Sequence, residues 1–257
     1  MKFARILPTS IFLLTATSMS VSAALVAHYT MDDGGNLGAN SGSATINWNS
    51  QSGATGISPG KLGNAGAFVA GSSSFWSNQF ASANTDVSNF SLSMHVRTTT
   101  TANWDDFVSI GIGNNSFVLE KNGSNGVSLF NIGNVGGVAS GGIASSIIVN
   151  DGAWHHIGMV SNGSTIELFM DGVSQGSVAY TGTGTLSSFQ LASRFGDGAR
   201  AITTDIDDVA VYDTALSAGQ MQWLSSNVAT TTPVPEPSSS LLIALSALGL
   251  TLRRKRA

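Results

Sequence analysis

The chain of 257 residues contains no cysteine. A disulfide framework, a thiolate metal site and a cysteine nucleophile are therefore excluded. Charge is also scarce, because only 10% of the residues are charged, against about 25% in a typical globular protein. The chain is nevertheless 42% hydrophobic and contains 30 glycines. This composition excludes a charged disordered chain and predicts a folded domain with many turns.

The few basic residues are concentrated at the two ends of the chain. Six of the 11 lie in the tails, namely Lys2, Arg5, Arg253, Arg254, Lys255 and Arg256. Between residues 24 and 230, five basic residues face 14 acidic ones, which gives this part a net charge near −9. Binding to a phosphate backbone requires a basic face. Nucleic acid is therefore not expected as a partner.

The N-terminus has the pattern of a secretory signal peptide. Lys2 and Arg5 precede the apolar run Ile11-Phe12-Leu13-Leu14, and small residues follow up to Ala23. A positive start, a short apolar stretch and small residues at the end are typical of a cleaved signal. We predict a signal peptide at residues 1–23 with cleavage after Ala23, the alternative being a buried N-terminal helix.

The C-terminus has three parts in a fixed order. A proline-containing linker at 229–234 leads to Pro235-Glu236-Pro237, followed by an apolar stretch at 238–252 and the cluster Arg253-Arg254-Lys255-Arg256. Fifteen helical residues span about 22 Å, which is short of the ~30 Å hydrocarbon core. A basic cluster after an apolar stretch halts translocation and stays in the cytoplasm. This predicts a single helix that anchors the chain transiently in the inner membrane.

The same tail resembles a PEP-CTERM sorting signal. The matching parts are Pro235-Glu236-Pro237, the apolar stretch 238–252 and the basic cluster 253–256. The resemblance implies processing by an exosortase, a membrane protease-transpeptidase of Gram-negative bacteria that make extracellular polysaccharide. It also implies delivery to the cell surface or the extracellular space. A plain tail anchor is the alternative.

Residues 24–228 have the pattern of β-strands. From Phe90 to Arg97, apolar and polar residues alternate, which predicts one buried and one solvent-facing side. Asp171-Gly172 predicts a two-residue hairpin turn, and Ser217 with Gln220 predicts a capping box on a helix to about Leu224. Many short strands without intervening helices predict an all-β, antiparallel two-sheet sandwich, with strands at 25–29, 67–69, 90–97, 107–112, 116–119, 127–132, 143–149, 155–160, 165–170, 189–192 and 206–212.

This stretch also resembles the laminin-G-like, concanavalin A-like jelly roll over nearly all of its length. Six pieces occur in the family's order: YTMDD at 29–33, GKLGNA at 60–65, the strand 90–97, WHHI at 154–157, LFMDG at 168–172 and IDDVAVY at 206–212. The resemblance implies that the first and last strands are neighbours. It also implies that a calcium ion is often held there, and that some relatives are glycoside hydrolases.

A hydrolase requires two carboxyl groups about 5–5.5 Å apart for retention or ~6.5–9.5 Å apart for inversion. The chain has three glutamates, Glu120, Glu167 and Glu236, and the last lies in the tail. Glu167 and Asp171 would be roughly 13 Å apart along a strand, and the Glu-x-Asp-x-(x)-Glu strand of the hydrolase relatives is missing. We therefore expect no enzyme, although composition leaves a Ser-His-Asp triad open.

The metal and ligand predictions concern acidic loops and tryptophans. Calcium binds carboxylate, amide and backbone oxygens, and by resemblance Asp32 and Asp207 match the acidic positions, with Asp33 and Asn36 as further candidates. The alternative is a solvated acidic edge that discourages edge pairing. Trp48, Trp76 and Trp104 lie in polar surroundings, so we predict that they are flat platforms for a saccharide. The alternative is that each closes an end of the sandwich.

The sequence therefore predicts an exported, non-catalytic surface or matrix protein that binds a glycan or a protein, processed by an exosortase. A self-associating coat or biofilm protein is the alternative, and a glycoside hydrolase is a second one. A structural calcium ion is the only cofactor expected.

Overall fold

The computed structural model describes residues 23–46, 48–79, 85–112, 115–132, 142–180, 182–194 and 200–230. Residues 1–22 of the predicted signal peptide lie outside the described residues. So does the sorting segment 235–257, with Pro235, Glu236, Pro237, the anchor helix and the terminal basic cluster. Within the described residues, no helix is long and apolar enough to span a membrane.

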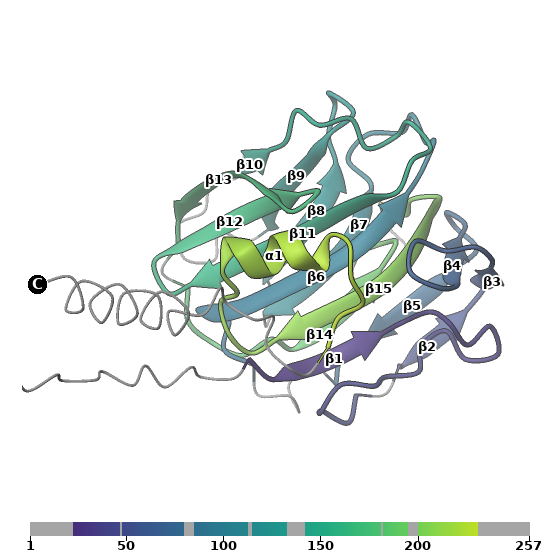
Figure 1. Cartoon of the computed structure of the whole chain (residues 1–257), viewed down its shortest axis with the longest axis horizontal. Coiled ribbons are helices and arrows are strands. Elements are labelled where there is room, and N and C mark those ends of the chain that lie inside the picture. Colours follow the sequence, from purple (N-terminus) through teal and green to yellow (C-terminus); the bar gives the residue numbers. More distant parts are fainter. Residues whose placement is uncertain are drawn as a thin grey trace, which may run out of the picture.

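The described chain folds into two antiparallel sheets that form a sandwich (Figure 1). Sheet A has the strand order β13 (Val173–Ala179), β12 (Thr165–Met170), β11 (His155–Asn162), β6 (Asn89–Arg97), β15 (Thr204–Tyr212), β4 (Ala65–Phe68) and β3 (Thr55–Ile57), and β1 (Leu25–Tyr29) also pairs with β15. Sheet B has the order β10 (Ile143–Ala144), β9 (Val127–Ile132), β8 (Asn115–Lys121), β7 (Asp106–Ile112), β14 (Ser188–Leu191), β5 (Ser74–Ser77) and β2 (Ser50–Ser52). One helix, α1 (Ala218–Leu224), follows the last strand.

The local sequence signals explain most of these elements. Asp171 and Gly172 both have positive φ, 48° and 76°, as the predicted hairpin turn between β12 and β13 requires. The capping box at α1 is present, with the Ser217 hydroxyl accepting from the Gln220 backbone and the Gln220 side chain accepting in return. The first and last strands are neighbours, as the resemblance implied, since Ala27, His28 and Tyr29 pair with β15.

Three expectations about strands were wrong in detail. The expected strand at 143–149 is only the two-residue β10, because the chain then leaves the sheet. The short strands β2, β3 and β5 were not predicted, because three or four residues rich in serine and glycine give no alternation signal. The predicted solvent-facing side of β6 was also wrong, since Ser91, Ser93 and His95 are buried.

The physical reason for that burial is α1, which lies across the outer face of sheet A (Figure 1). The Ser91 hydroxyl accepts from the Leu216 backbone at 2.8 Å, and His95 Nε2 donates to the Ser225 carbonyl at 3.2 Å. Met221 and Leu224 of α1 are buried in a second apolar cluster with Phe169. Part of the outer face of sheet A is therefore covered by α1.

Under α1, two buried histidine rings face each other. The rings of His95 and His156 have centroids 5.3 Å apart, and His156 is only 2% exposed. Burial, together with the neighbouring His95, lowers the pKa of His156 to about 3. Burial also lowers the pKa of His95. Both imidazoles are therefore neutral in the folded protein at physiological pH.

This pair predicts a loss of stability in mild acid. Below pH 6.5 the unfolded chain binds protons that the folded imidazoles do not, so stability falls as the pH falls. Between pH 7.5 and pH 5, the wild type should lose about 2 kcal/mol more unfolding free energy than His156→Gln. Urea unfolding at both pH values measures this difference. Half-buried His155, whose pKa Asp171 raises, provides the control His155→Gln, which should not reduce the acid loss. Equal losses of unfolding free energy in wild type and His156→Gln between the two pH values would refute the prediction.

Packed residues lie on both sides of the predicted domain limits of 24 and 228. Ala23 and Ala229 are 5% and 3% exposed, and the Ala229 backbone donates to Asp208 Oδ2 at 3.0 Å. The Ala24 backbone nitrogen donates to Asp213 Oδ1 at 2.9 Å. Cleavage after Ala23 would therefore place the new α-amino group beside the Asp213 carboxylate.

Candidate ligand-binding site

The outer face of sheet B carries two acidic side chains directly opposite each other. Asp106 of β7 pairs with Glu120 of β8. Their strand neighbours Phe107 and Leu119 point into the core, so alternation along each strand turns both carboxyl groups outward. The sequence did not reveal this pair, because Asp106 and Glu120 are brought together by cross-strand register alone.

Arg194 lies between the two carboxyl groups. Its guanidinium donates to both oxygens of Asp106 at 2.6 Å and to Glu120 Oε2 at 3.3 Å. Asp106 is fully buried, and the Arg194 side chain is 12% exposed. Burial raises the pKa of Asp106 to about 7, against the opposing effect of Arg194. Burial also raises the pKa of Glu120. The three side chains thus form one compact ionic cluster.

Beside this cluster lies a pocket of about 580 Å³, which we call the Trp104 pocket. Its floor comes from β8, β9 and β10 of sheet B, and its rim comes from the loops before β7 and after β8. Trp104 is 49% exposed at this rim. The lining residues are Trp104, Glu120, Asn122, Gly123, Ser124, Ser128, Gly142, Ala144, Arg194 and Arg200.

The backbone around the Trp104 pocket is strained. Trp104, Asn125 and Arg200 have φ values of 68°, 65° and 53°, in the left-handed region that side chains other than glycine rarely occupy. For a bulky residue such as tryptophan this conformation is a clear outlier, and such strain clusters at functional sites. Two of the seven non-glycine residues with positive φ in the described chain, Trp104 and Arg200, therefore line this pocket, and a third, Asn125, directly follows the lining residue Ser124.

Lys121 holds the strained loops in place. Its ammonium group, fully buried, donates to Asn103 Oδ1 at 2.7 Å and to Asn125 Oδ1 at 3.1 Å. The Trp104 backbone donates to the Lys121 carbonyl at 2.7 Å. The indole is thereby fixed next to Gly123, where an added Cβ would lie 3.4 Å from the ring. Hydrogen bonds therefore hold the backbone that carries the indole.

The three tryptophans predicted as platforms do not share one surface. Trp48 packs against Tyr29, Phe75 and Phe189 at centroid distances of 5.0, 5.4 and 6.2 Å, so it closes an edge of the core. Trp76 is half-buried on β5 in register with Gln190, and it does not line the Trp104 pocket. Only Trp104 combines an exposed ring with a pocket.

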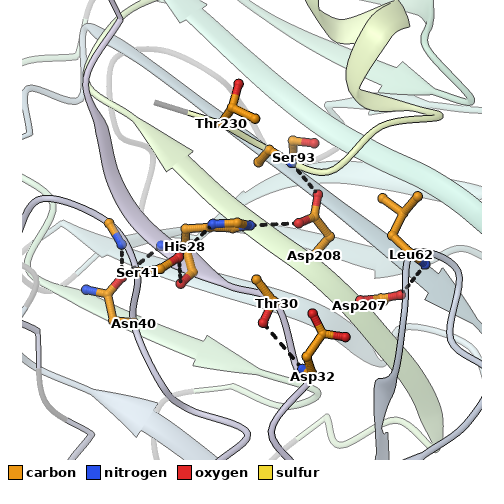
Figure 2. A network of polar contacts seen from close by, with 12 residues as sticks. His28, Thr30, Asp32, Asn40, Ser41, Leu62, Ser93, Asp207, Asp208 and Thr230 are labelled. Carbon is orange, nitrogen blue, oxygen red and sulfur yellow. Dashed lines mark hydrogen bonds and ion pairs between the residues drawn. The ribbon is translucent and has the colours of Figure 1, made fainter. Parts of the chain in front are cut away.

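Asp32 and Asp207, two of the four calcium candidates, both contact the 60–64 loop. Asp207 Oδ2 accepts from the Lys61 and Leu62 backbones, each at 2.8 Å, and Asp32 Oδ1 accepts from the Asn64 backbone at 2.8 Å. Figure 2 shows Asp207 beside Leu62, with Asp32 nearby. Asp207 is fully buried, and its Oδ1 has no hydrogen-bond partner. Burial raises the pKa of Asp207 to about 7, with Asp208 and Asp32 adding to the effect.

The other two calcium candidates, Asp33 and Asn36, make hydrogen bonds to other residues. Asp33 Oδ1 accepts from the Gly35 backbone at 2.9 Å, and Asn36 Oδ1 accepts from Gln51 Nε2 at 2.8 Å. Across the described ranges, no three side chains of His, Asp or Glu gather in a way that could hold a metal ion. An ion at Asp32 and Asp207 would therefore need backbone oxygens or water as further ligands. The unpartnered Asp207 Oδ1 is the one atom here that suits a cation.

Ser41, His28 and Asp208 form a hydrogen-bonded Ser-His-Asp arrangement next to the 60–64 loop (Figure 2). His28 Nε2 contacts Asp208 Oδ1 at 2.7 Å, and Ser41 Oγ contacts His28 Nδ1 at 2.8 Å. A nucleophilic serine also needs free N–H donors for an oxyanion. The backbone N–H groups of residues 41, 42 and 43 instead donate to the His28 carbonyl, the Asn40 side chain and the Leu25 carbonyl. These hydrogen bonds therefore connect the 40–44 loop to β1 and β15.

A second serine has the spacing of a nucleophile elbow, in the sequence Gly172-Val173-Ser174-Gln175-Gly176. The elbow requires a sharp turn from a strand into a helix. Ser174 instead lies within β13 and donates to the Glu167 carboxylate. Its position on the edge strand of a hairpin does not fit that role.

Comparison with protein families gives two matches. The family model of the concanavalin A-like lectin/glucanases superfamily matches residues 73–222. The PEP-CTERM protein-sorting motif matches residues 233–256. No curated protein sequence matches the chain at a significant level.

Several solved structures share the fold. Domain 4 of AbnA, an extracellular arabinanase of Geobacillus stearothermophilus solved with arabinotriose, superposes with a TM-score of 0.62 and 21% identity, over 79% of this chain and 99% of that domain. The binding domain of Paraclostridial Mosquitocidal Protein 1 gives 0.59 and 14%, over 79% of this chain and 52% of that one. Trypanosoma rangeli sialidase in complex with sialic acid superposes with a TM-score of 0.59 and 13% identity, over 82% of this chain and 34% of the sialidase chain. The chain thus spans about half or less of the latter two, and these likenesses establish the sandwich fold.

Proposed function

This chain belongs to the concanavalin A-like lectin/glucanases superfamily, and from that premise we propose that it is a non-catalytic carbohydrate-binding module of the cell surface. The PEP-CTERM motif marks it as an exported protein and implies processing by an exosortase. We propose that its binding partner is an extracellular saccharide that enters the Trp104 pocket.

The observation that carries this proposal is the exposed, strained and fixed indole of Trp104 at the rim of a pocket. A saccharide presents a flat apolar ring face and a border of hydroxyl groups. An exposed aromatic face suits the former, and the Ser124 and Ser128 side chains offer hydrogen-bonding groups for the latter. A small-molecule site commonly combines apolar surface with a few placed polar groups in this way.

The ionic cluster supports a binding role rather than hydrolysis. A glycosidase needs one carboxyl group that can donate a proton and one that can attack or activate water. Here both oxygens of Asp106 accept from Arg194, and Asp106 is inaccessible to a sugar. Geometry takes precedence over a raised pKa when a general acid is assigned. We therefore propose that Asp106 and Glu120 position Arg194 at the pocket wall.

We also propose a structural calcium ion held by Asp32 and Asp207. The support is the buried, unpartnered Asp207 Oδ1 beside a loop that both carboxylates hold. Such an ion would neutralise two neighbouring acidic groups and fix the 60–64 loop against β15. It would take no part in saccharide binding, which we place on the other sheet.

The proposed function is tested by titrating the exported protein with arabinotriose, cellotriose, galactotriose and trigalacturonate in a calorimeter. At least one should bind, and Trp104→Ala should weaken that binding at least tenfold, because truncating a central aromatic contact costs about 2 kcal/mol or more. Trp223→Ala on α1 is the matched control and should bind as wild type does. The trisaccharides should be recovered uncleaved.

Absence of binding to all four saccharides, or equal binding by Trp104→Ala, would refute the proposed site. Concentration-dependent self-association without saccharide binding would support a coat protein instead. Cleavage of any trisaccharide by wild type, lost in Glu120→Gln, would show that the cluster is catalytic.

A further inference from the structure

Basic side chains in the folded domain are concentrated at one place. Between residues 24 and 230 the chain has only five, and three of them, Lys121, Arg194 and Arg200, lie at the Trp104 pocket or directly support it. The other two, Lys61 and Arg97, do not line this pocket. In a domain of net charge near −9, this is an uneven distribution.

The three cations differ in what they already contact. Lys121 is buried and bonded to Asn103 and Asn125, and Arg194 is bonded to Asp106 and Glu120. Arg200 is exposed at the pocket wall. Its guanidinium makes no hydrogen bond or ion pair with any residue that the structure describes. Among the described residues, Arg200 is therefore the cation of the pocket to which no side chain is bonded.

The backbone holds Arg200 at this place. The Asp106 backbone donates to the Arg200 carbonyl at 2.8 Å, and Ala201 forms a β-bridge with Asp106. The residue keeps a left-handed φ of 53° as a result. The Arg200 charge opposes the rise that burial causes in the pKa of half-buried Asp105, but among the described residues no ion pair joins the two side chains. The backbone of Arg200 is thus held in place, and its guanidinium acts on the neighbouring carboxyl groups through charge alone.

From this arrangement we propose that the Trp104 pocket selects acidic saccharides, sugars whose ring carries a carboxylate or a sulfate group. The ring face lies on Trp104, and the anionic group accepts hydrogen bonds from Arg200. A guanidinium is the side chain best suited to such planar or multidentate anions. This inference rests on the proposed function, because it names the ligand class of the same pocket.

The excess of acidic residues outside the pocket sharpens the selection. A polyanion approaching any other face of the domain meets net negative charge, which disfavours nonspecific association. Binding should therefore depend on one local contact with Arg200 rather than on a broad basic surface. Raised salt should weaken the binding of an acidic trisaccharide, while that of a neutral one should change little.

The test compares three trisaccharides of galactose type: trigalacturonate, sulfated galactotriose and neutral galactotriose. At least one acidic probe should bind the exported protein at least tenfold more tightly than the neutral probe. Arg200→Gln should weaken the binding of that acidic probe at least tenfold and that of the neutral probe much less, so that the preference is lost. Asp105→Asn, which removes a carboxyl group on which the Arg200 charge acts, should strengthen acidic binding several-fold.

Arg97→Gln is the matched control, because it makes the same charge change away from the pocket, and its affinities should equal those of wild type. Thermal melting checks that each variant is folded. Preferential or equal binding of the neutral probe, unchanged by Arg200→Gln, would overturn this inference and leave the proposed function intact. Failure of every saccharide to bind would refute both.

Discussion

Replacing Arg194 with methionine should lower the free energy of unfolding by about 3–5 kcal/mol, because it leaves two buried carboxyl groups without their cation. Asp106 is fully buried and accepts two hydrogen bonds from Arg194, and Glu120 accepts a third. For a domain of about 200 residues, this change corresponds to a fall in melting temperature of about 10 °C. Calorimetric melting at pH 7.5 measures it.

A second variant distinguishes unpaired buried charge from lost packing as the cause of this destabilisation. The triple variant Arg194→Met, Asp106→Asn, Glu120→Gln keeps the shape of the cluster but removes all three charges, and it should recover most of the stability. The single Arg194→Met variant should be less impaired at pH 5 than at pH 7.5, because its carboxyl groups can then bind protons and become neutral. If the triple variant were as unstable as the single one, unpaired charge would not be the cause.

Chelation of calcium should produce the second large decrease in the stability of the folded protein. With free calcium at 100 to 1,000 times its dissociation constant, a bound ion stabilises the folded state by about 2.7–4.1 kcal/mol. Transfer of the exported protein from millimolar calcium to EDTA should therefore lower the melting temperature by roughly 6–12 °C. The ion would satisfy the buried Asp207 Oδ1, which has no hydrogen-bond partner among the described residues.

Asp207→Asn and Asp32→Asn should abolish this calcium-dependent shift while preserving the shape of each side chain. Asp33→Asn is the matched control, because Asp33 caps the Gly35 backbone instead, and it should keep the full shift. Magnesium should not replace calcium, since it favours a smaller and more rigid octahedral site. A melting temperature indifferent to EDTA would exclude the calcium site.

The sheets were largely predictable because alternation and turn chemistry are local signals. Asp171-Gly172 specifies its turn through positive φ, and Ser217 with Gln220 specifies the start of α1. Short strands such as β2 and β3 were not predictable, since their pairing depends on neighbours distant in sequence. The burial of Ser91 and His95 likewise depends on where α1 packs, which alternation along β6 cannot show.

The candidate site was predictable only in part. Trp104 stood out as an aromatic residue in polar surroundings, and the structure places it at a pocket. The same reasoning applied to Trp48, which instead packs against core aromatics. Glu120 and Arg194 are 74 residues apart, and their contact follows from the register of β7 with β8 and of β14 with β7. Such long-range pairings leave no trace in the spacing of residues along one chain.

The most direct test of the account is a crystal structure of the exported protein with the saccharide that binds it most tightly. We predict an uncleaved sugar in the Trp104 pocket, with one ring stacked on the indole and its anionic group at Arg200. A sugar bound only on another surface, with the Trp104 pocket left empty at saturating ligand, would contradict the account.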